Sequence, residues 1–323
     1  MAHQTLIDSS DPTQDHRFAD SPSRRFGQGF SPLDIVVFAY LALLSLILLG
    51  LAQLSDAAPF LGYHALVALM IVLLVRADRG FGGRFWNVLR WGYPIVLVPA
   101  AFREVWFTAR LVNPFDGFRN PSDNFQFDRM LNALDLRLFG IDSGRLVALA
   151  GHPLLTDLLT LCYAVYYFLP VILVLHLYIH GKMAQFEVAM TAIVAAFLVS
   201  YLGYLVVPAV GPFYFLRADE VHPALLGWVV AMPVRDLLKG MEWTMPDAFP
   251  SGHTMVTLVT LHYAWRFARP LSWILMPVGA GLVVATVYLR YHYLVDVTAG
   301  MLLTAGILAA MVPVQRKVFG QTD

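Results

Sequence analysis

About eight apolar runs of near-membrane length restrict the folds that are open to this chain. They lie at roughly 34–54, 60–76, 87–108, 154–179, 185–207, 251–268, 271–290 and 293–314. Most approach the ~20 apolar residues that a helix needs to cross ~30 Å of hydrocarbon. Composition agrees, because 58% of the 323 residues are hydrophobic and 14% are charged, whereas soluble domains have roughly 45–50% and about 25%. The sequence therefore predicts an all-α, polytopic membrane bundle with about 6–8 transmembrane helices.

Two of these runs account for the lower end of that range. The run at 60–76 is short, and the run at 87–108 contains Pro94 and Pro99, residues that interrupt helices. No apolar stretch follows Met1 closely, so we expect no cleavable signal peptide. The chain divides into a polar segment expected to be disordered (1–32), N-terminal membrane helices with a long connection (33–153), a C-terminal membrane core (154–315) and a tail (316–323).

The placement of lysine and arginine predicts the orientation of the bundle, because cytoplasmic loops are enriched in these residues. With a cytoplasmic N-terminus, every short loop assigned to the inside is basic, and both termini lie in the cytoplasm. The residues concerned are Arg24, Arg25, Arg76, Arg79, Arg84, Arg90, Lys182, Arg266, Arg269, Arg316 and Lys317. The outside then receives two long segments, about 109–153 and 208–250.

Charge and cysteine content remove two classes of site. The formal net charge is +0, so nothing indicates a nucleic-acid partner. Cys162 is the single cysteine, which excludes an intramolecular disulfide and a cysteine-rich zinc site.

The first outer segment contains an amphipathic helix between Asp123 and Gly140. Its apolar residues recur at helical spacing with polar residues between them, namely Phe127, Met130, Leu131, Leu134 and Leu138 among Asp128, Arg129, Asn132 and Asp135. We expect this helix to lie in the outer membrane interface, either as a cap over the bundle or as a platform that admits lipid. Asp116, Asp123 and Asp128 either contact a polar acceptor or are solvated charges.

The segment Pro250-Ser251-Gly252-His253 stands at the beginning of the apolar run at 251–268. A helix start leaves backbone N–H groups without partners and has the positive end of the helix dipole, so it binds anions. Ser251 adds a hydroxyl donor, Gly252 allows phosphate to approach closely, and His253 can serve as a general acid. An ordinary capped helix start with an interfacial histidine would have the same residues.

A second motif, Arg290 to Asp296, stands at the beginning of the last run. His292 and Asp296 are four residues apart and are therefore expected on one helix face. A carboxylate inside the membrane requires a polar partner, and a hydrogen bond between the two would leave the other imidazole nitrogen free as a nucleophile. Arg290 is suited to bidentate phosphate binding. A structural His–Asp pair beside an interfacial arginine is the alternative.

The two motifs together resemble the type-2 phosphatidic acid phosphatase superfamily over roughly residues 150–315. That family has a P-S-G-H motif, matched by Pro250 to His253, and an H-x-x-x-D motif, matched by His292 and Asp296. The resemblance implies that His292 forms a phosphohistidine, that Asp296 supports it, and that His253 is first the acid and then the base. It implies a catalytic core at 154–315 that needs neither metal nor cofactor.

Two departures from the family pattern narrow the resemblance. The first motif, a lysine followed by Arg-Pro, is missing, and Thr286 stands where an arginine is expected. The chain is similar to the branch that contains inositol phosphorylceramide synthase and bacterial relatives, an inositolphosphotransferase branch of sphingolipid metabolism. That branch has a G-P segment and a Y-L-x-x-H-Y-x-x-D pattern, matched by Gly211, Pro212, Tyr288, Leu289, His292, Tyr293 and Asp296. The resemblance to this branch, together with the lack of a second cysteine, favours a bacterial inner membrane. The placement of lysine and arginine puts both motifs, and with them the active site, on the periplasmic or another non-cytoplasmic side.

The missing basic residues also bear on the substrate. A phosphate monoester has a charge of about −1.5 to −2 at pH 7, whereas a phosphodiester has one negative charge, so fewer cations suit a diester. Arg217, Arg235 and Lys239 could restore positive charge. Arg217 is nearest to the Gly211-Pro212 turn and either contacts phosphate or is a solvated loop charge.

The function predicted is that of a membrane lipid phosphotransferase. It would move a phosphoinositol-like or other phosphoalcohol group from a phospholipid donor to a hydroxyl-bearing lipid or polyol acceptor. The alternative is a lipid phosphate phosphatase, acting on phosphatidate or a polyprenyl phosphate, with water as the acceptor. A transporter with a proton relay would require ionisable groups distributed through the bundle. Tyr163, Tyr166 and Tyr167 are interpreted as membrane-interface residues.

Overall fold

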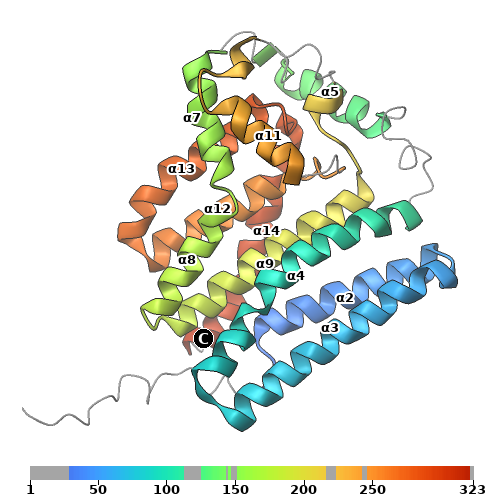
Figure 1. The fold of residues 1–323 in the computed structure, drawn as a ribbon, viewed down its shortest axis with the longest axis vertical. Coiled ribbons are helices and arrows are strands. Elements are labelled where there is room, and N and C mark those ends of the chain that lie inside the picture. The colour runs from blue at the N-terminus through green and yellow to red at the C-terminus, as the bar shows by residue number, and fades with distance from the viewer. Residues whose placement is uncertain are drawn as a thin grey trace, which may run out of the picture.

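The computed structural model describes residues 29–112, 125–142, 145–146, 151–215, 223–241 and 246–320, and all regular elements in these ranges are helices (Figure 1). The elements are α2 (Pro32–Leu51), α3 (Leu54–Phe81), α4 (Gly83–Val112), α5 (Gln126–Phe139), α7 (Pro153–Ala164), α8 (Phe168–Ile179), α9 (Met183–Val206), α10 (Pro212–Phe215), the 3₁₀ helix η4 (Pro223–Leu226), α11 (Ala231–Met241), α12 (Gly252–Phe267), α13 (Arg269–Tyr288) and α14 (Leu294–Phe319). The predicted all-α bundle is therefore confirmed.

Five of the described helices are long and apolar enough to cross a membrane: α2, α3, α9, α13 and α14. The run predicted at 154–179 is a pair of helices, α7 and α8, bent by 46°, and it makes a sixth span if the pair is counted as one. The helices α12 and α4 are not among these candidates. The helix α12 has only 16 residues, and α4 contains charged residues along its length. Pro94 and Pro99 do not break α4. The count agrees with the lower end of the predicted range.

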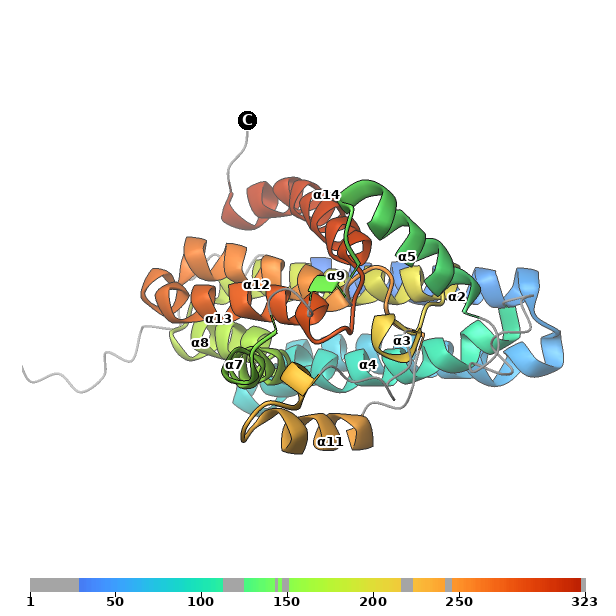
Figure 2. The same ribbon diagram turned by 90° about the horizontal axis from the view of Figure 1, so that it is seen from above.

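The helix α9 is the centre of the bundle. The helices α2, α4, α8, α12 and α14 pack around it (Figure 1), and 72% of its most apolar window is buried, against at most 44% in the other four candidate spans. Figure 2 shows α5 beside α14 on one side of the bundle and α11 on the other. The two motifs therefore lie on helices that the central span supports directly.

Basic residues gather at the end of the bundle opposite to the two histidine motifs. Lys182 Nζ donates to the Phe267 carbonyl at 2.8 Å, and Arg266 Nη1 donates to Gln315 Oε1 at 2.6 Å. These contacts lie at the C-terminal end of α12, whereas His253 lies in its first turn. At 1.5 Å per residue, about 20 Å separates the two ends.

The amphipathic helix predicted between Asp123 and Gly140 is α5, and its buried face contains carboxylates. Asp128 and Asp135 are 2% and 0% exposed, whereas Met130 and Leu138 are 44% and 64% exposed. Leu131 is the apolar residue of this helix that is fully buried. The helix therefore packs against α14 through a stripe that includes two carboxylates, and the interpretation of Asp128 as a substrate contact or a solvated charge is wrong.

A buried ion pair joins the first helices of the bundle. Asp34 on α2 accepts hydrogen bonds from Arg90 and from the Tyr93 hydroxyl on α4, the latter at 3.0 Å. Asp34 is 0% exposed and Arg90 is 4% exposed. Two charges removed from the solvent in this way depend on each other, because either alone would be strongly disfavoured.

We predict that Arg90→Met lowers the free energy of unfolding by about 3–5 kcal/mol, since it leaves the Asp34 carboxylate buried without a counter-charge. The double variant Asp34→Asn with Arg90→Met should recover most of this loss. Thermal unfolding in detergent, with Arg103→Met as an exposed control on the same helix, measures both. Equal losses in the single and double variants would show that the charges are not coupled.

Candidate active site

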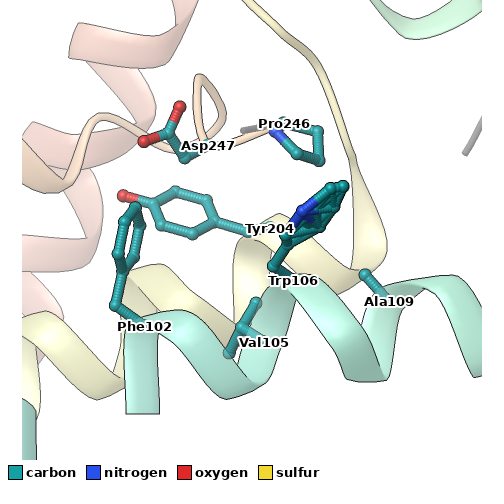
Figure 3. Close-up of a pocket in the computed structure, with 7 residues that line it drawn as sticks. All are labelled: Phe102, Val105, Trp106, Ala109, Tyr204, Pro246 and Asp247. Atoms are coloured by element: carbon teal, nitrogen blue, oxygen red, sulfur yellow. The ribbon is translucent and has the colours of Figure 1, made fainter. Parts of the chain in front are cut away.

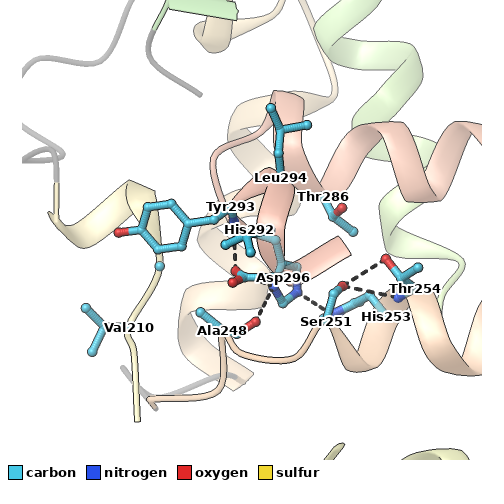
Figure 4. Close-up of polar contacts among 12 residues, drawn as sticks. Val210, Ala248, Ser251, His253, Thr254, Thr286, His292, Tyr293, Leu294 and Asp296 are labelled. Atoms are coloured by element: carbon cyan, nitrogen blue, oxygen red, sulfur yellow. Dashed lines mark hydrogen bonds and ion pairs between the residues drawn. The ribbon is translucent and has the colours of Figure 1, made fainter. Parts of the chain in front are cut away.

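The two histidine motifs lie side by side (Figure 4), and their backbones are hydrogen-bonded to each other. The Ser251 amide donates to the Asp296 carbonyl at 3.1 Å, and the Ser251 hydroxyl caps α12 by accepting from the Thr254 amide at 3.2 Å. Close packing needs a glycine on α14, because a Cβ at Gly300 would lie 2.9 Å from the Ser251 carbonyl oxygen. The beginnings of α12 and α14 are therefore held side by side.

His292 lies in the turn before α14 rather than on the helix, so the prediction that it shares a helix face with Asp296 is wrong. The helix begins at Leu294. The amides of Tyr291 and His292 both donate to the Thr286 carbonyl, at 3.0 and 2.9 Å. Arg290 adopts a φ of 68° in this turn, a conformation that is uncommon for residues other than glycine.

A backbone carbonyl, and not Asp296, makes the short hydrogen bond to the imidazole. His292 Nδ1 lies 2.7 Å from the Ala248 oxygen and 3.5 Å from Asp296 Oδ2. The Asp296 carboxylate accepts instead from the Tyr293 amide at 2.8 Å. Because a carbonyl oxygen only accepts, Nδ1 has the hydrogen, and in the neutral imidazole Nε2 has the lone pair. The predicted free nitrogen is present, but the group that sets the tautomer is different.

His253 lies on the side of His292 that has this lone pair. His253 Nδ1 is 3.2 Å from His292 Nε2. Its ring stacks on Tyr163, with centroids 4.8 Å apart, and lies 4.1 Å from the ring of Tyr166. Both tyrosines are buried, at 3% and 6% exposure, so their interpretation as membrane-interface residues is wrong. Their spacing of three residues in the sequence shows that the two tyrosines share a face, but it does not identify His253 as the residue they contact.

Two carboxylates of α5 bind the Gly211 segment and the residues that follow His292. Asp128 accepts from the Gly211 amide at 2.9 Å and from the Tyr293 hydroxyl at 3.0 Å. Asp135 accepts from the amides of Leu294 and Val295, at 2.9 and 2.8 Å, and so caps α14.

Burial raises the pKa of Asp128 and Asp135, while their backbone N–H partners act in the opposite direction. A folded-state pKa above the unfolded value means that the stability contributed by the group is largest at low pH. It declines as the pH rises through the raised pKa. Mild acidification therefore does not undock α5 through these groups.

The Gly211-Pro212 segment, predicted to stand in for a missing motif, lies against the His292 turn. The Phe213 amide donates to the Arg290 carbonyl at 2.7 Å. Gly211 has a φ of 90°, and a Cβ there would lie 2.4 Å from the Tyr291 carbonyl oxygen. Only glycine satisfies both conditions, so this segment supports the turn from its backbone.

Two arginines bring positive charge close to the turn. Burial lowers the pKa of Arg290; Asp142 opposes this effect and Arg235 adds to it, although a guanidinium stays protonated. Arg235 is 5% exposed and donates to the Leu225 carbonyl at 3.0 Å. Arg217 lies outside the described residues.

Polar atoms without partners mark the site. In the part of the chain that the structure describes, His253 Nε2, Arg290 Nε and Asp296 Oδ1 are buried and have no hydrogen-bond partner. Because buried polar atoms are normally satisfied, these atoms are candidates for contact with a ligand. Within the same described ranges, no three His, Cys, Asp or Glu side chains form a group that could hold a metal ion.

A small pocket borders the site between α4, α9 and residues 246–247 (Figure 3). It is lined by Phe102, Val105, Trp106, Ala109, Tyr204, Pro246 and Asp247, and its empty volume is about 230 Å³, including space open to the exterior. Asp247 precedes Ala248, and a Cβ at Gly252 would lie 2.4 Å from the Tyr204 hydroxyl. Gly252 therefore has a packing role beside this pocket.

A model of the PAP2 superfamily matches residues 130–310. The chain belongs to the PAP2 superfamily. Its members are generally phosphatases and phosphotransferases, so membership supports an enzyme that acts on lipid phosphoesters. No curated protein and no solved structure gave a significant match. The matched region extends from α5 to α14 and includes both histidines, whereas α2, α3 and α4 lie outside it.

We predict that Asp135→Ala destabilises the protein by about 1–3 kcal/mol and lowers turnover, because two buried amides at the start of α14 lose their acceptor. Arg137→Ala, an exposed change on the same helix, is the matched control for thermal unfolding and activity. Wild-type values for Asp135→Ala would show that α5 does not position the His292 turn.

Proposed function

We propose that this protein is a membrane lipid phosphotransferase that works through a phosphohistidine on His292. It would transfer a phosphoalcohol head group from a phospholipid to the hydroxyl of a lipid or polyol acceptor. The observation that supports this most directly is the pair of imidazoles, in which His292 Nδ1 is held by the Ala248 carbonyl and Nε2 faces His253. A histidine held in one tautomer, with a second histidine beside its free nitrogen, suits nucleophilic catalysis.

In the first half-reaction, His292 Nε2 attacks phosphorus, and the bond from phosphorus to the departing alcohol oxygen breaks. That oxygen takes a proton from His253, the general acid. In the second half-reaction His253 accepts the proton of the acceptor hydroxyl. The acceptor oxygen then bonds to phosphorus, and the N–P bond breaks, which restores both imidazoles.

The hydrogen bond between the imidazoles must be replaced when substrate binds. The 3.2 Å contact from His253 Nδ1 to His292 Nε2 occupies the direction from which phosphorus would approach the lone pair. His253 Nε2 has no partner in the described ranges, and stacking on Tyr163 and Tyr166 keeps the ring near the site. Catalytic hydrogen bonds often form fully only with substrate present.

Arg290 and the first turn of α12 are the proposed phosphate-binding groups. The unpartnered Nε of Arg290 supports its part in this proposal. The Ser251 amide and hydroxyl already have backbone partners, so phosphate binding by Ser251 and Gly252 stays a prediction. The same holds for Arg217.

Thr286 favours a phosphodiester over a monoester as substrate. It is fully buried, and its hydroxyl donates to the Val283 carbonyl at 2.7 Å. A threonine has no charge, so a phosphate in the site gains no cation from this position. A diester has one negative charge and needs fewer cations than a monoester.

We further propose that the site lies on the non-cytoplasmic side, that both termini are cytoplasmic and that the membrane is a bacterial inner membrane. The basic end opposite to the histidines favours this orientation.

We predict that purified protein in mixed lipid vesicles converts an anionic phosphodiester lipid and a hydroxyl acceptor into a new phospholipid and a lipid alcohol. Mass spectrometry identifies both products, and His292→Ala should form neither while keeping the wild-type unfolding temperature. Free phosphate released from phosphatidic acid, without a new lipid, would identify a phosphatase instead. Activity lost in EDTA and restored by added metal would contradict the histidine mechanism.

We predict that Arg290→Gln weakens turnover by about 10- to 100-fold, since a charge-assisted hydrogen bond to phosphate contributes about 1.5–3 kcal/mol. The same vesicle assay measures this loss, and Arg129→Gln on the exposed side of α5 is the control. An unchanged rate would assign phosphate binding to other groups.

A further inference from the structure

A buried carboxylate fixes the short helix α11 to the bundle. The helix lies against α7 (Figure 2). Asp157 on α7 is 7% exposed and accepts hydrogen bonds from four successive amides, those of residues 228–231, at 2.8 to 3.0 Å. A Cβ at Gly227 would collide with Asp157 Oδ1. Because the last of the four amides is the first of α11, Asp157 caps this helix from α7 and sets its position.

This docking places Arg235, in the second turn of α11, against the turn before α14. Arg235 Cζ lies 5.6 Å from the centre of the Phe213 ring. The Phe213 ring stacks on that of Tyr291, with centroids 6.1 Å apart, and the Phe213 amide donates to the Arg290 carbonyl at 2.7 Å. Val234 packs in the same apolar cluster as Tyr291. Phe213 thus joins the two arginines, through its ring to Arg235 and through its amide to Arg290.

Neither arginine has a carboxylate partner in the described ranges, where the ion pairs involve other residues. Arg235 is 5% exposed and donates to a neutral acceptor, the Leu225 carbonyl, at 3.0 Å. Arg290 Nε is buried without a hydrogen-bond partner. Buried arginines are normally paired with an anion. Two such guanidiniums on adjoining segments therefore favour an anion bound between them.

The two guanidiniums also repel each other. Burial is the largest cause of the lowered pKa of Arg290; Asp142 opposes this effect and the charge of Arg235 adds to it. An anion in contact with both arginines would remove the repulsion and give Arg290 Nε a charged acceptor.

Two other roles fit the observations less well. A purely structural residue at position 235 needs no charge, because a neutral donor also reaches the Leu225 carbonyl without the cost of burying a cation. A metal ion would be repelled by two arginines, and no group of three metal-ligating side chains occurs in the described ranges. A phosphate group matches the guanidinium instead, because its oxygens accept two parallel N–H donors.

We propose that Arg235 and Arg290 form a binding site for a phosphate group, and that Asp157 is the positioning residue that holds Arg235 there. The inference rests on the proposed function in taking this phosphate to belong to the phospholipid. Arg235 then replaces part of the positive charge that the missing family motif would supply. Two arginines are still fewer cations than the lysine and two arginines of the family pattern, which agrees with a diester.

The test is the thermal unfolding midpoint of the full-length protein in uncharged detergent, titrated at constant ionic strength with inorganic phosphate or with short-chain phosphatidylglycerol. We expect the midpoint to rise with the probe in the wild type and in Asp236→Asn, an exposed change on α11. Arg235→Gln should need about 10- to 100-fold more probe for the same rise, because a charge-assisted hydrogen bond is lost.

The two probes distinguish the sources of the phosphate. A rise with phosphatidylglycerol supports a head-group site, and a rise with inorganic phosphate alone supports a site for free phosphate. No rise with either probe, or equal curves for the wild type and Arg235→Gln, would overturn the proposal. Glutamine keeps a donor for the Leu225 carbonyl, so the midpoint without probe reports any structural loss separately.

The role of Asp157 is tested by a double-variant cycle. In Asp157→Asn the amide group opposes the backbone amides of residues 228–231, so α11 loses its position and the affinity for the probe should fall. The double variant of Asp157→Asn and Arg235→Gln should bind no more weakly than Arg235→Gln alone, because both changes remove the same guanidinium. Additive losses would show that Asp157 does not act through Arg235.

None of these measurements uses turnover. Binding through Arg235 in a protein that forms no new phospholipid would contradict the proposed phosphotransfer and leave this site in place. Phosphotransfer together with unchanged binding in Arg235→Gln would remove this site alone.

Discussion

Two carboxylates on one short helix hold the candidate active site together. Asp128 and Asp135 lie seven residues apart on α5, about two turns, and therefore face the same side. They accept hydrogen bonds from the Gly211 segment, from Tyr293 and from the first amides of α14. These groups belong to segments that are distant in the sequence. Because a buried carboxylate needs several donors, their convergence on α5 places the His292 turn next to the start of α12.

The chemistry of the site then depends on the segment before α12. The Ala248 carbonyl sets the tautomer of His292, and the Ala248 amide is in turn held by the Ala209 carbonyl at 2.9 Å. Asp296 contributes by holding the Tyr293 amide and lies 3.5 Å from the imidazole. The nucleophile is thus oriented by backbone geometry, while the aspartate fixes the turn that contains it. The orientation of His292 therefore depends on the backbone of residue 248 as well as on the two family motifs.

The helices outside the family match also contribute to the site. The helix α4 packs against α9 and provides Phe102 and Trp106 to the pocket beside Asp247. The buried pairs Asp34–Arg90 and His64–Glu104 join it to α2 and α3. Since a buried polar group that loses its partner is costly, these contacts give the N-terminal helices a defined position against the core. The proposed site therefore has one wall that the superfamily region does not encode.

The sequence by itself determined the membrane class, the helical fold and the two histidine motifs, because apolar length and motif spacing are local properties. It also predicted α5 as an amphipathic helix, but not which of its faces meets the bundle. Only the tertiary structure decided that Asp128 and Asp135 face inward, that Tyr163 and Tyr166 enclose His253, and that Ala248 contacts His292. The last contact joins two residues that are 44 positions apart in the sequence, and Tyr293 and Asp128, which are hydrogen-bonded, are 165 positions apart. Helical periodicity shows which residues share a face, but which faces meet depends on the packing of the whole bundle.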